Sequence, residues 1–270
     1  MVISDGAILP LSGIIDNTGT IELNSTGSGT ELELIEHGIT LQGHGQVILS
    51  DSSENVLTGT VSDVKLTNVD NTISGAGHLG NGQMTLVNEG TIIATGTNAL
   101  DIDTGTNVVV NTGTLEATGS GGLVIHGDVA NSGLLWANGG NVTIAGAVSG
   151  SGSAVIDGIA TLEFGAASSM QTTFGQDAAG TLQLDDSLDF SGVLSGFGQD
   201  DHLDLSDIKF GAGVTHDYLA NAEGTGGTLT VSDGAHTANI SLLGQYTADG
   251  FHVSDDQHTG TLITYGWLIV

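Results

Sequence analysis

The sequence predicts an all-β protein: a parallel β-helix (β-solenoid) with rungs of about 20–23 residues, followed by a C-terminal β-rich region. Two observations carry this prediction. Short apolar runs such as VVV, LVI and VTI are bounded by Gly, Asn, Asp or Ser, as short strands are, and no helical period lasts for more than about two turns. A phrase that begins with asparagine also recurs at nearly regular intervals along the chain.

The recurring phrase is Asn-x-Gly-x-apolar-x-apolar, and its copies begin at Asn17, Asn88, Asn111 and Asn131. In a stack of rungs, each Asn amide can bond to the equivalent Asn above and below, and Asn also accepts the left-handed conformation at a corner. The glycine two residues later allows the corner to turn tightly. We therefore expect Asn88, Asn111 and Asn131 at equivalent corners of stacked rungs, with Leu115 and Leu135 pointing inward. The alternative is a set of ordinary hairpin turns in an antiparallel sandwich.

Composition excludes several classes of function. The chain has 31 acidic side chains, only Lys65 and Lys209 as basic ones, and a formal charge of −29. Such a charge repels phosphate backbones and anionic lipid, so we expect no nucleic-acid partner and no membrane insertion. The hydrophobic content of 39% argues for a folded chain. Without cysteine, neither disulfides nor thiolate metal sites can form.

The character of the sequence changes near residue 165. Residues 1–165 are expected to form the parallel β-helix repeats, and residues 166–270 an acidic β-rich C-terminal module into which the solenoid can continue. Strand-like runs persist in this second part, for example TGGTLTVSD and HTANISLLG, but the loops are longer and the repetition is weaker.

The phrases LEFGAASS, GTLQLDD, FSGVLSGFGQDDHLDLSDI and GGTLTVSDGAHTANISLLGQY resemble a repeat or C-terminal module of very large surface exoproteins of alphaproteobacteria. From Asp200 on, the chain is also similar to the RTX-type tails of calcium-binding proteins. The resemblance implies an adhesin-like, non-catalytic protein at the cell surface or secreted, exported by type I secretion without a cleaved N-terminal signal. Its expected partners are cell-surface or matrix glycans or proteins, or copies of itself.

Calcium is the candidate cofactor, although the calcium nonapeptide of such tails is only partly matched at 195–203, where Ser195 replaces the first glycine and His202 the apolar residue. The candidate ligands are the aspartates of one dense segment: Asp185, Asp186, Asp189, Asp200, Asp201, Asp204 and Asp207. Calcium takes six to eight oxygen ligands, which carboxylates, carbonyls and water supply. Like charges this close repel unless a cation lies among them; otherwise they are solvated turn residues.

Catalysis is the main alternative, because parallel β-helices also include carbohydrate-active enzymes. Asp101 and Asp103 would lie on one strand face, about 6–7 Å apart, which suits a glycoside hydrolase. A lyase is disfavoured, since the chain has no arginine with which to neutralise a uronate. The histidines show no metal-ligand spacing. We expect no catalytic site. A further alternative is a filament or matrix subunit that stacks end to end through uncapped rung ends.

Overall fold

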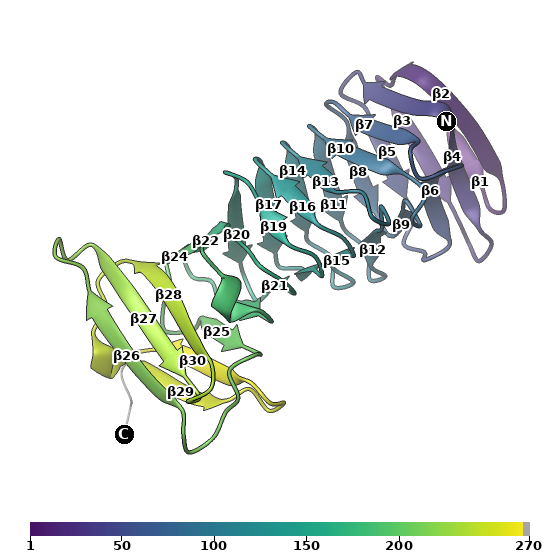
Figure 1. The fold of residues 1–270 in the computed structure, drawn as a ribbon. Coiled ribbons are helices and arrows are strands. Elements are labelled where there is room, and N and C mark those ends of the chain that lie inside the picture. The colour runs from purple at the N-terminus through teal and green to yellow at the C-terminus, as the bar shows by residue number, and fades with distance from the viewer. Residues whose placement is uncertain (267–270) are drawn as a thin grey trace.

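The protein folds into a β-solenoid of about nine turns, and the computed structural model describes residues 1–266 (Figure 1). Apart from two short 3-10 turns, η1 (Ser187–Asp189) and η2 (Ala248–Gly250), its regular elements are strands. None of the described residues belongs to a helix long and apolar enough to span a membrane. The predicted parallel β-helix is confirmed.

Three ladders of parallel strands run along the rod, and each rung contributes one strand or bridge to each ladder. Ladder 1 is formed by β1 (Val2–Ser4), β3 (Thr20–Asn24), β5 (Gln46–Leu49), β8 (Thr72–Gly75), β11 (Thr91–Ala94), β14 (Thr114–Ala117), β17 (Leu134–Asn138), β20 (Ser153–Asp157), β22 (Gln171–Phe174) and β24 (Val193–Ser195).

Ladders 2 and 3 are joined at the N-terminal end by two long strands, β2 (Ile8–Asp16) and β4 (Thr30–Gln42). The first part of β4 pairs with β6 of ladder 2, and its last part pairs with β7 of ladder 3. Ladder 2 continues through β6 (Asn55–Gly59), β9 (Gly77–Leu79), β12 (Leu100–Ile102), β15 (Leu123–Ile125), β18 (Val142–Ile144), β21 (Thr161–Phe164), β23 (Thr181–Leu184) and β25 (His202–Leu205). Ladder 3 continues through β7 (Lys65–Asn68), β10 (Thr85–Asn88), β13 (Val109–Asn111), β16 (Val129–Asn131) and β19 (Val148–Ser149).

The interior is filled by the inward side chains of all three ladders. Side chains alternate between interior and surface along each strand, so one apolar residue stacks on its equivalent in the next rung. Leu115 of β14 lies opposite Leu135 of β17, and both are completely buried, as predicted. A single rung cannot form this continuous column of apolar side chains, so each rung depends on its neighbours for stability.

A row of buried asparagines runs along one corner of the interior, and we call Asn68, Asn88, Asn111 and Asn131 the Asn row. Asn68 Nδ2 donates to Asn88 Oδ1 over 2.9 Å, and Asn88 Nδ2 donates to Asn111 Oδ1 over 2.8 Å. Asn111 Nδ2 continues the row by donating to Asn131 Oδ1 over 2.7 Å. The predicted stacking of Asn88, Asn111 and Asn131 is confirmed, and Asn68, which does not begin the recurring phrase, extends it by one rung.

One of the two reasons expected for Asn at this corner is wrong, and Gly is needed for a closer contact than expected. The asparagines of the row end extended strands of ladder 3, and none of them has a positive φ, so the left-handed explanation was wrong. Glycine is needed because successive corners touch. A Cβ on Gly133 would clash with the backbone oxygen of Gly113, and one on Gly113 would clash with that of Gly90.

An antiparallel region closes the C-terminal end of the rod. Its strands are β26 (Thr215–Ala220), β27 (Gly226–Ser232), β28 (Thr237–Leu243), β29 (Phe251–Asp255) and β30 (Thr261–Tyr265). Strand β28 pairs with β24 at the end of ladder 1, β27 pairs with β28, and β26 pairs with β27. Strand β30 pairs with β25 at the end of ladder 2, and β29 pairs with β30. The parallel rungs thus run past residue 165, and antiparallel pairing begins at β25.

The stacked interior leads to a first prediction. Leu135→Ala should lower the free energy of unfolding by about 2–5 kcal/mol, because it opens a cavity in a column that cannot collapse. Leu219→Ala is the matched control, since Leu219 of β26 is exposed and its loss should change stability by no more than about 0.5 kcal/mol. Urea unfolding measures both, and equal effects would contradict the buried column.

The Asn row leads to a second prediction. Asn111→Ala should destabilise the fold by about 1–3 kcal/mol, because it leaves the buried Oδ1 of Asn131 without a donor. Nδ2 of Asn88 loses one acceptor but keeps the backbone oxygens of Thr114 and Gly90. Asn24→Ala, at an exposed strand end, is the control. If thermal unfolding does not distinguish the two variants, the row does not stabilise the stack.

Candidate functional site

The seven candidate calcium ligands are divided between two segments of the chain. Asp185, Asp186 and Asp189 follow β23, whereas the others lie before, within and after β25. Asp200 and Asp201 precede that strand, Asp204 lies in it, and Asp207 follows it. Within residues 1–266, no group of three or more His, Asp or Glu side chains has the arrangement of a metal site.

Two of the seven aspartates hold neighbouring rungs together. Asp201 is almost completely buried and accepts hydrogen bonds from the backbone N–H of Gly198 (2.8 Å) and Gly180 (3.3 Å). Burial raises the pKa of its carboxyl group, while these two donors oppose the shift. Asp207 accepts from both the backbone N–H (3.0 Å) and the hydroxyl (2.6 Å) of Ser187, one rung earlier. These carboxylates therefore act as acceptors that secure loops.

Asp204 is different, because its Oδ1 is buried and has no hydrogen-bond partner among the described atoms. Burial, followed by repulsion from Asp256 and Asp185, raises the pKa of Asp204 to about 6, and His258 opposes this shift. Asp256 and His258 come from the loop between β29 and β30, which the antiparallel pairing of β30 with β25 brings to this position. Neither residue could be predicted from the sequence as part of this site, since no local signal reveals that pairing.

The outer face of ladder 2 carries a second cluster, made by three successive rungs. Asp101 of β12 lies between two histidines: its Oδ2 is 3.4 Å from His78 Nδ1, and its Oδ1 is 3.4 Å from His126 Nε2. All three side chains are at least a quarter exposed. Asp103, the expected partner of Asp101, instead accepts from the backbone N–H of Gly105 at 2.8 Å. Sequence spacing alone could not find this cluster, since it depends on the register of β9 and β12.

The outer face of ladder 1 carries Trp136, whose ring is held in place by the next rung. Trp136 Nε1 donates to Asp157 Oδ2 over 2.7 Å, and the neighbouring Asn138 Nδ2 donates to Glu116 Oε1, also over 2.7 Å. Beside Trp136, a shallow hollow of about 450 Å³ follows the corner between ladders 3 and 1. It is lined mainly by small and hydroxyl-bearing residues: Thr112, Gly113, Thr114, Ser132, Gly133, Leu134, Ser151, Gly152, Ser153 and Gln171.

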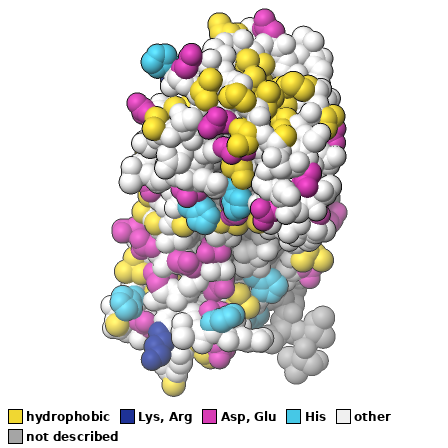
Figure 2. All heavy atoms as spheres, turned by 90° about the vertical axis from the view of Figure 1, so that its right-hand side faces the viewer, with side chains coloured by type: hydrophobic (Ala, Val, Ile, Leu, Met, Phe, Trp, Pro, Cys, Tyr) yellow, Lys and Arg dark blue, Asp and Glu magenta, His cyan; other side chains and the backbone are white. Residues whose placement is uncertain are grey.

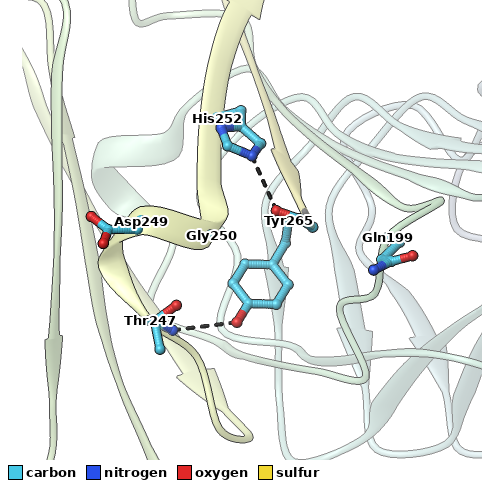
Figure 3. A pocket seen from close by; sticks show the side chains of 7 residues that line it. Gln199, Thr247, Asp249, Gly250, His252 and Tyr265 are labelled. Carbon is cyan, nitrogen blue, oxygen red and sulfur yellow. Dashed lines mark hydrogen bonds between the residues drawn. The ribbon is translucent and has the colours of Figure 1, made fainter. Parts of the chain in front are cut away.

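A more enclosed hollow of about 310 Å³ lies in the C-terminal region (Figure 3). Figure 3 shows Tyr265 between Thr247 and His252; its hydroxyl accepts from the Thr247 N–H at 3.3 Å. His252 Nε2 is 3.1 Å from the Gly266 carbonyl oxygen. The remaining lining comes from Gln199, Asp249 and Gly250. Its titratable side chains are thus few and largely engaged within the fold.

Comparisons with known proteins do not assign a function. Neither a protein-family model nor a curated protein sequence matches this chain. The candidate sites therefore depend on the geometry alone.

The environment of Asp204 leads to a third prediction. Because its pKa is raised in the folded state, the stability that it contributes is present below about pH 4 and is lost as the pH rises through about 6. Asp204→Asn should remove this loss of stability at higher pH. With a metal chelator present, the variant should melt about 2–4 °C above the parent chain at pH 7.5 for each kcal/mol gained, and the difference should shrink toward pH 4.

Asp200→Asn is the control for this experiment, since Asp200 is exposed in the turn before β25. It removes one negative charge from the same segment without touching the buried position. If both variants raise the melting temperature equally, general charge reduction is the cause and the specific role of Asp204 is wrong.

Proposed function

We propose that this chain is an extracellular, structural and adhesin-like repeat module without a catalytic site, and that its partners are cell-surface or matrix glycans or proteins. The main support is the way in which the polar side chains are used. The buried amides of the Asn row lock rung to rung, and the outer carboxylates of Asp157 and Glu116 bond to neighbouring rungs. Such an arrangement favours a stiff rod with ordered faces.

The outer face around Trp136 is the surface that we assign to the partner. An aromatic side chain whose orientation is fixed by a hydrogen bond can stack on a sugar ring with little loss of conformational entropy. Next to it, Thr114, Leu134 and Ser153 occupy the same register position in successive rungs. Rungs repeat at about 4.8 Å, so the hydroxyl groups of Thr114 and Ser153 lie two rungs apart in this row, with the apolar side chain of Leu134 between them. A neutral glycan fits best, because a charge of −29 repels polyanions.

Secretion belongs to the same proposal. The resemblance to alphaproteobacterial surface exoproteins supports export by type I secretion, and the absence of cysteine suits a chain that passes between redox compartments.

The Asp101 cluster is the specific observation that favours the competing enzymatic function. A carboxylate between two histidines has the groups needed for acid–base chemistry. None of the three side chains lines the hollows described above, so a substrate held there would remain in water. We therefore place catalysis second.

A fourth prediction tests the partner. The parent chain should be retained on insoluble neutral polysaccharide, with cellulose and chitin as probes, and Trp136→Ala should lose at least about tenfold in affinity. Ile93→Ala, on the same outer face, is the matched control and should bind like the parent. Equal retention of all three would assign binding to another face, and no retention would leave proteins as the proposed partners.

Turnover is measured in the same samples. We expect no release of reducing ends and no ultraviolet-absorbing product from pectate or alginate. Turnover that Asp101→Asn abolishes and Asp204→Asn leaves intact would establish the enzymatic alternative.

Calcium remains part of the proposal as a stabilising ion. If it binds the folded chain, millimolar calcium must raise the melting temperature relative to chelator at fixed ionic strength. Asp200→Asn combined with Asp204→Asn should remove most of that gain, whereas Asp101→Asn should not. Identical melting curves in calcium and chelator would contradict calcium binding.

A further inference from the structure

The hollow beside Trp136 is elongated along the rod axis. Three successive corners line it, at residues 112–114, 132–134 and 151–153, and Gln171 of the next rung lies at its C-terminal end. From Thr114 to Gln171 the register advances by three rungs, so the hollow extends roughly 14 Å along the rod. Within each rung it takes up only three consecutive residues, roughly 7 Å of chain. This shape suits an extended ligand that lies parallel to the rod.

The lining of the hollow is uncharged in a strongly acidic protein. None of its side chains is ionisable, although the chain has 31 acidic residues. Figure 2 shows acidic side chains at several levels along the face that it presents. The uncharged stretch begins after Glu89, which holds the corner position equivalent to Thr112, because Asn88 pairs with Asn111. The hollow therefore favours a neutral ligand of limited length.

The groups that the hollow offers to a ligand are side-chain hydroxyls. Its backbone groups are used between rungs: the Gly133 N–H donates to the Asn111 oxygen over 3.2 Å, and the Gly133 oxygen accepts from the Ser153 N–H at 3.0 Å. A peptide that adds as a further strand needs free backbone groups, which this floor does not offer. Of the hydroxyl groups in the hollow, only that of Thr112 is bonded within residues 1–266, to the Asn88 oxygen at 3.5 Å. The other hydroxyls can bond to those of a sugar.

We propose that this hollow holds a linear, neutral, β-linked glycan that lies along the rod axis, with about one sugar residue to each rung and the middle one stacked on Trp136. The inference rests on the proposed function, to which it adds the shape of the partner and its direction on the rod.

The position of Trp136 supports this direction. It belongs to the middle rung and lies two residues from Leu134 on the same outer face of β17, so the two side chains form an apolar platform at the middle of the hollow. The hydroxyl groups of Thr114 and Ser153 lie one rung before and one rung after this platform. Each sugar of an extended β-linked chain advances by nearly one rung spacing, about 4.8 Å. Its neighbours would thus meet these hydroxyls while the middle sugar stacks on the ring.

Soluble oligosaccharides of two to six sugars test the length of the site. Calorimetry with cello-oligosaccharides should show an affinity that rises at least about tenfold from two sugars to four and then levels off, since the hollow is filled. Malto-oligosaccharides contain the same sugar in a chain that coils, and they should bind at least about tenfold more weakly. An affinity that does not change with length, or equal binding of both series, would overturn the proposal.

Matched variants test the direction of the glycan. Thr114→Val and Ser153→Ala should each weaken binding of the four-sugar ligand about two- to tenfold, because each removes one hydrogen bond. Thr72→Val is the control, since Thr72 lies in the same outer column two rungs before Thr114 and outside the hollow. It should bind like the parent chain, and circular dichroism checks that all three variants are folded.

Two results of this series would contradict the assigned direction. If Trp136→Ala weakens binding while Thr114→Val and Ser153→Ala do not, the glycan crosses the rod within one rung. If Thr72→Val weakens binding as much as Thr114→Val, the contact lies outside the hollow.

Failure of this inference can be told apart from failure of the proposed function. Trp136-dependent retention on insoluble cellulose, without binding of any soluble oligosaccharide, would keep the glycan partner and reject the hollow as its site. Loss of both kinds of binding would reject the glycan partner and this inference together.

Discussion

The register between neighbouring rungs is the constraint on which the rest of this structure depends. A slip of one residue in any strand would turn the apolar column outward. The Asn row opposes such a slip, since each amide must meet one donor and one acceptor at fixed height, and an unmatched amide in the interior is costly. Every outer-face contact, including Trp136 with Asp157 and Asp101 with its two histidines, exists only because this register holds.

Contacts between equivalent positions of successive rungs could be predicted from the sequence. Contacts between non-equivalent segments could not. Leu115, Leu135 and three members of the Asn row followed from the recurring phrase, because identical segments stack on one another. Asn68 was missed, since Val-Asp-Asn follows it and Asp70 stands where the recurring phrase has glycine. The meeting of Asp204 with Asp256 depends on a change from parallel to antiparallel pairing, which the alternation of a strand does not encode.

Carboxylates that lie near one another on the surface have an electrostatic consequence in so acidic a chain. On the outer face of ladder 2, burial raises the pKa of Glu163, and the nearby Asp185 adds to this shift. Burial likewise raises the pKa of Glu31 at the other end of the ladder, with Glu33 adding to it. Carboxylates that lie close together on a partly buried surface cannot all stay ionised without cost. The carboxyl groups of Glu163 and Glu31 therefore keep their protons to a higher pH than a free glutamate does.

The antiparallel region also bears on the order in which the chain folds. Strands β27 and β28 are joined by residues 233–236 only, whereas each rung must close a loop of 20 residues or more before its Asn can pair. Shorter loops close with less loss of chain entropy, and local contacts form faster. The β27–β28 hairpin can therefore form before the rungs pair, and β28 then offers an edge to which β24 adds. Since synthesis proceeds from the N-terminus, the rungs leave the ribosome before the hairpin that can form fastest.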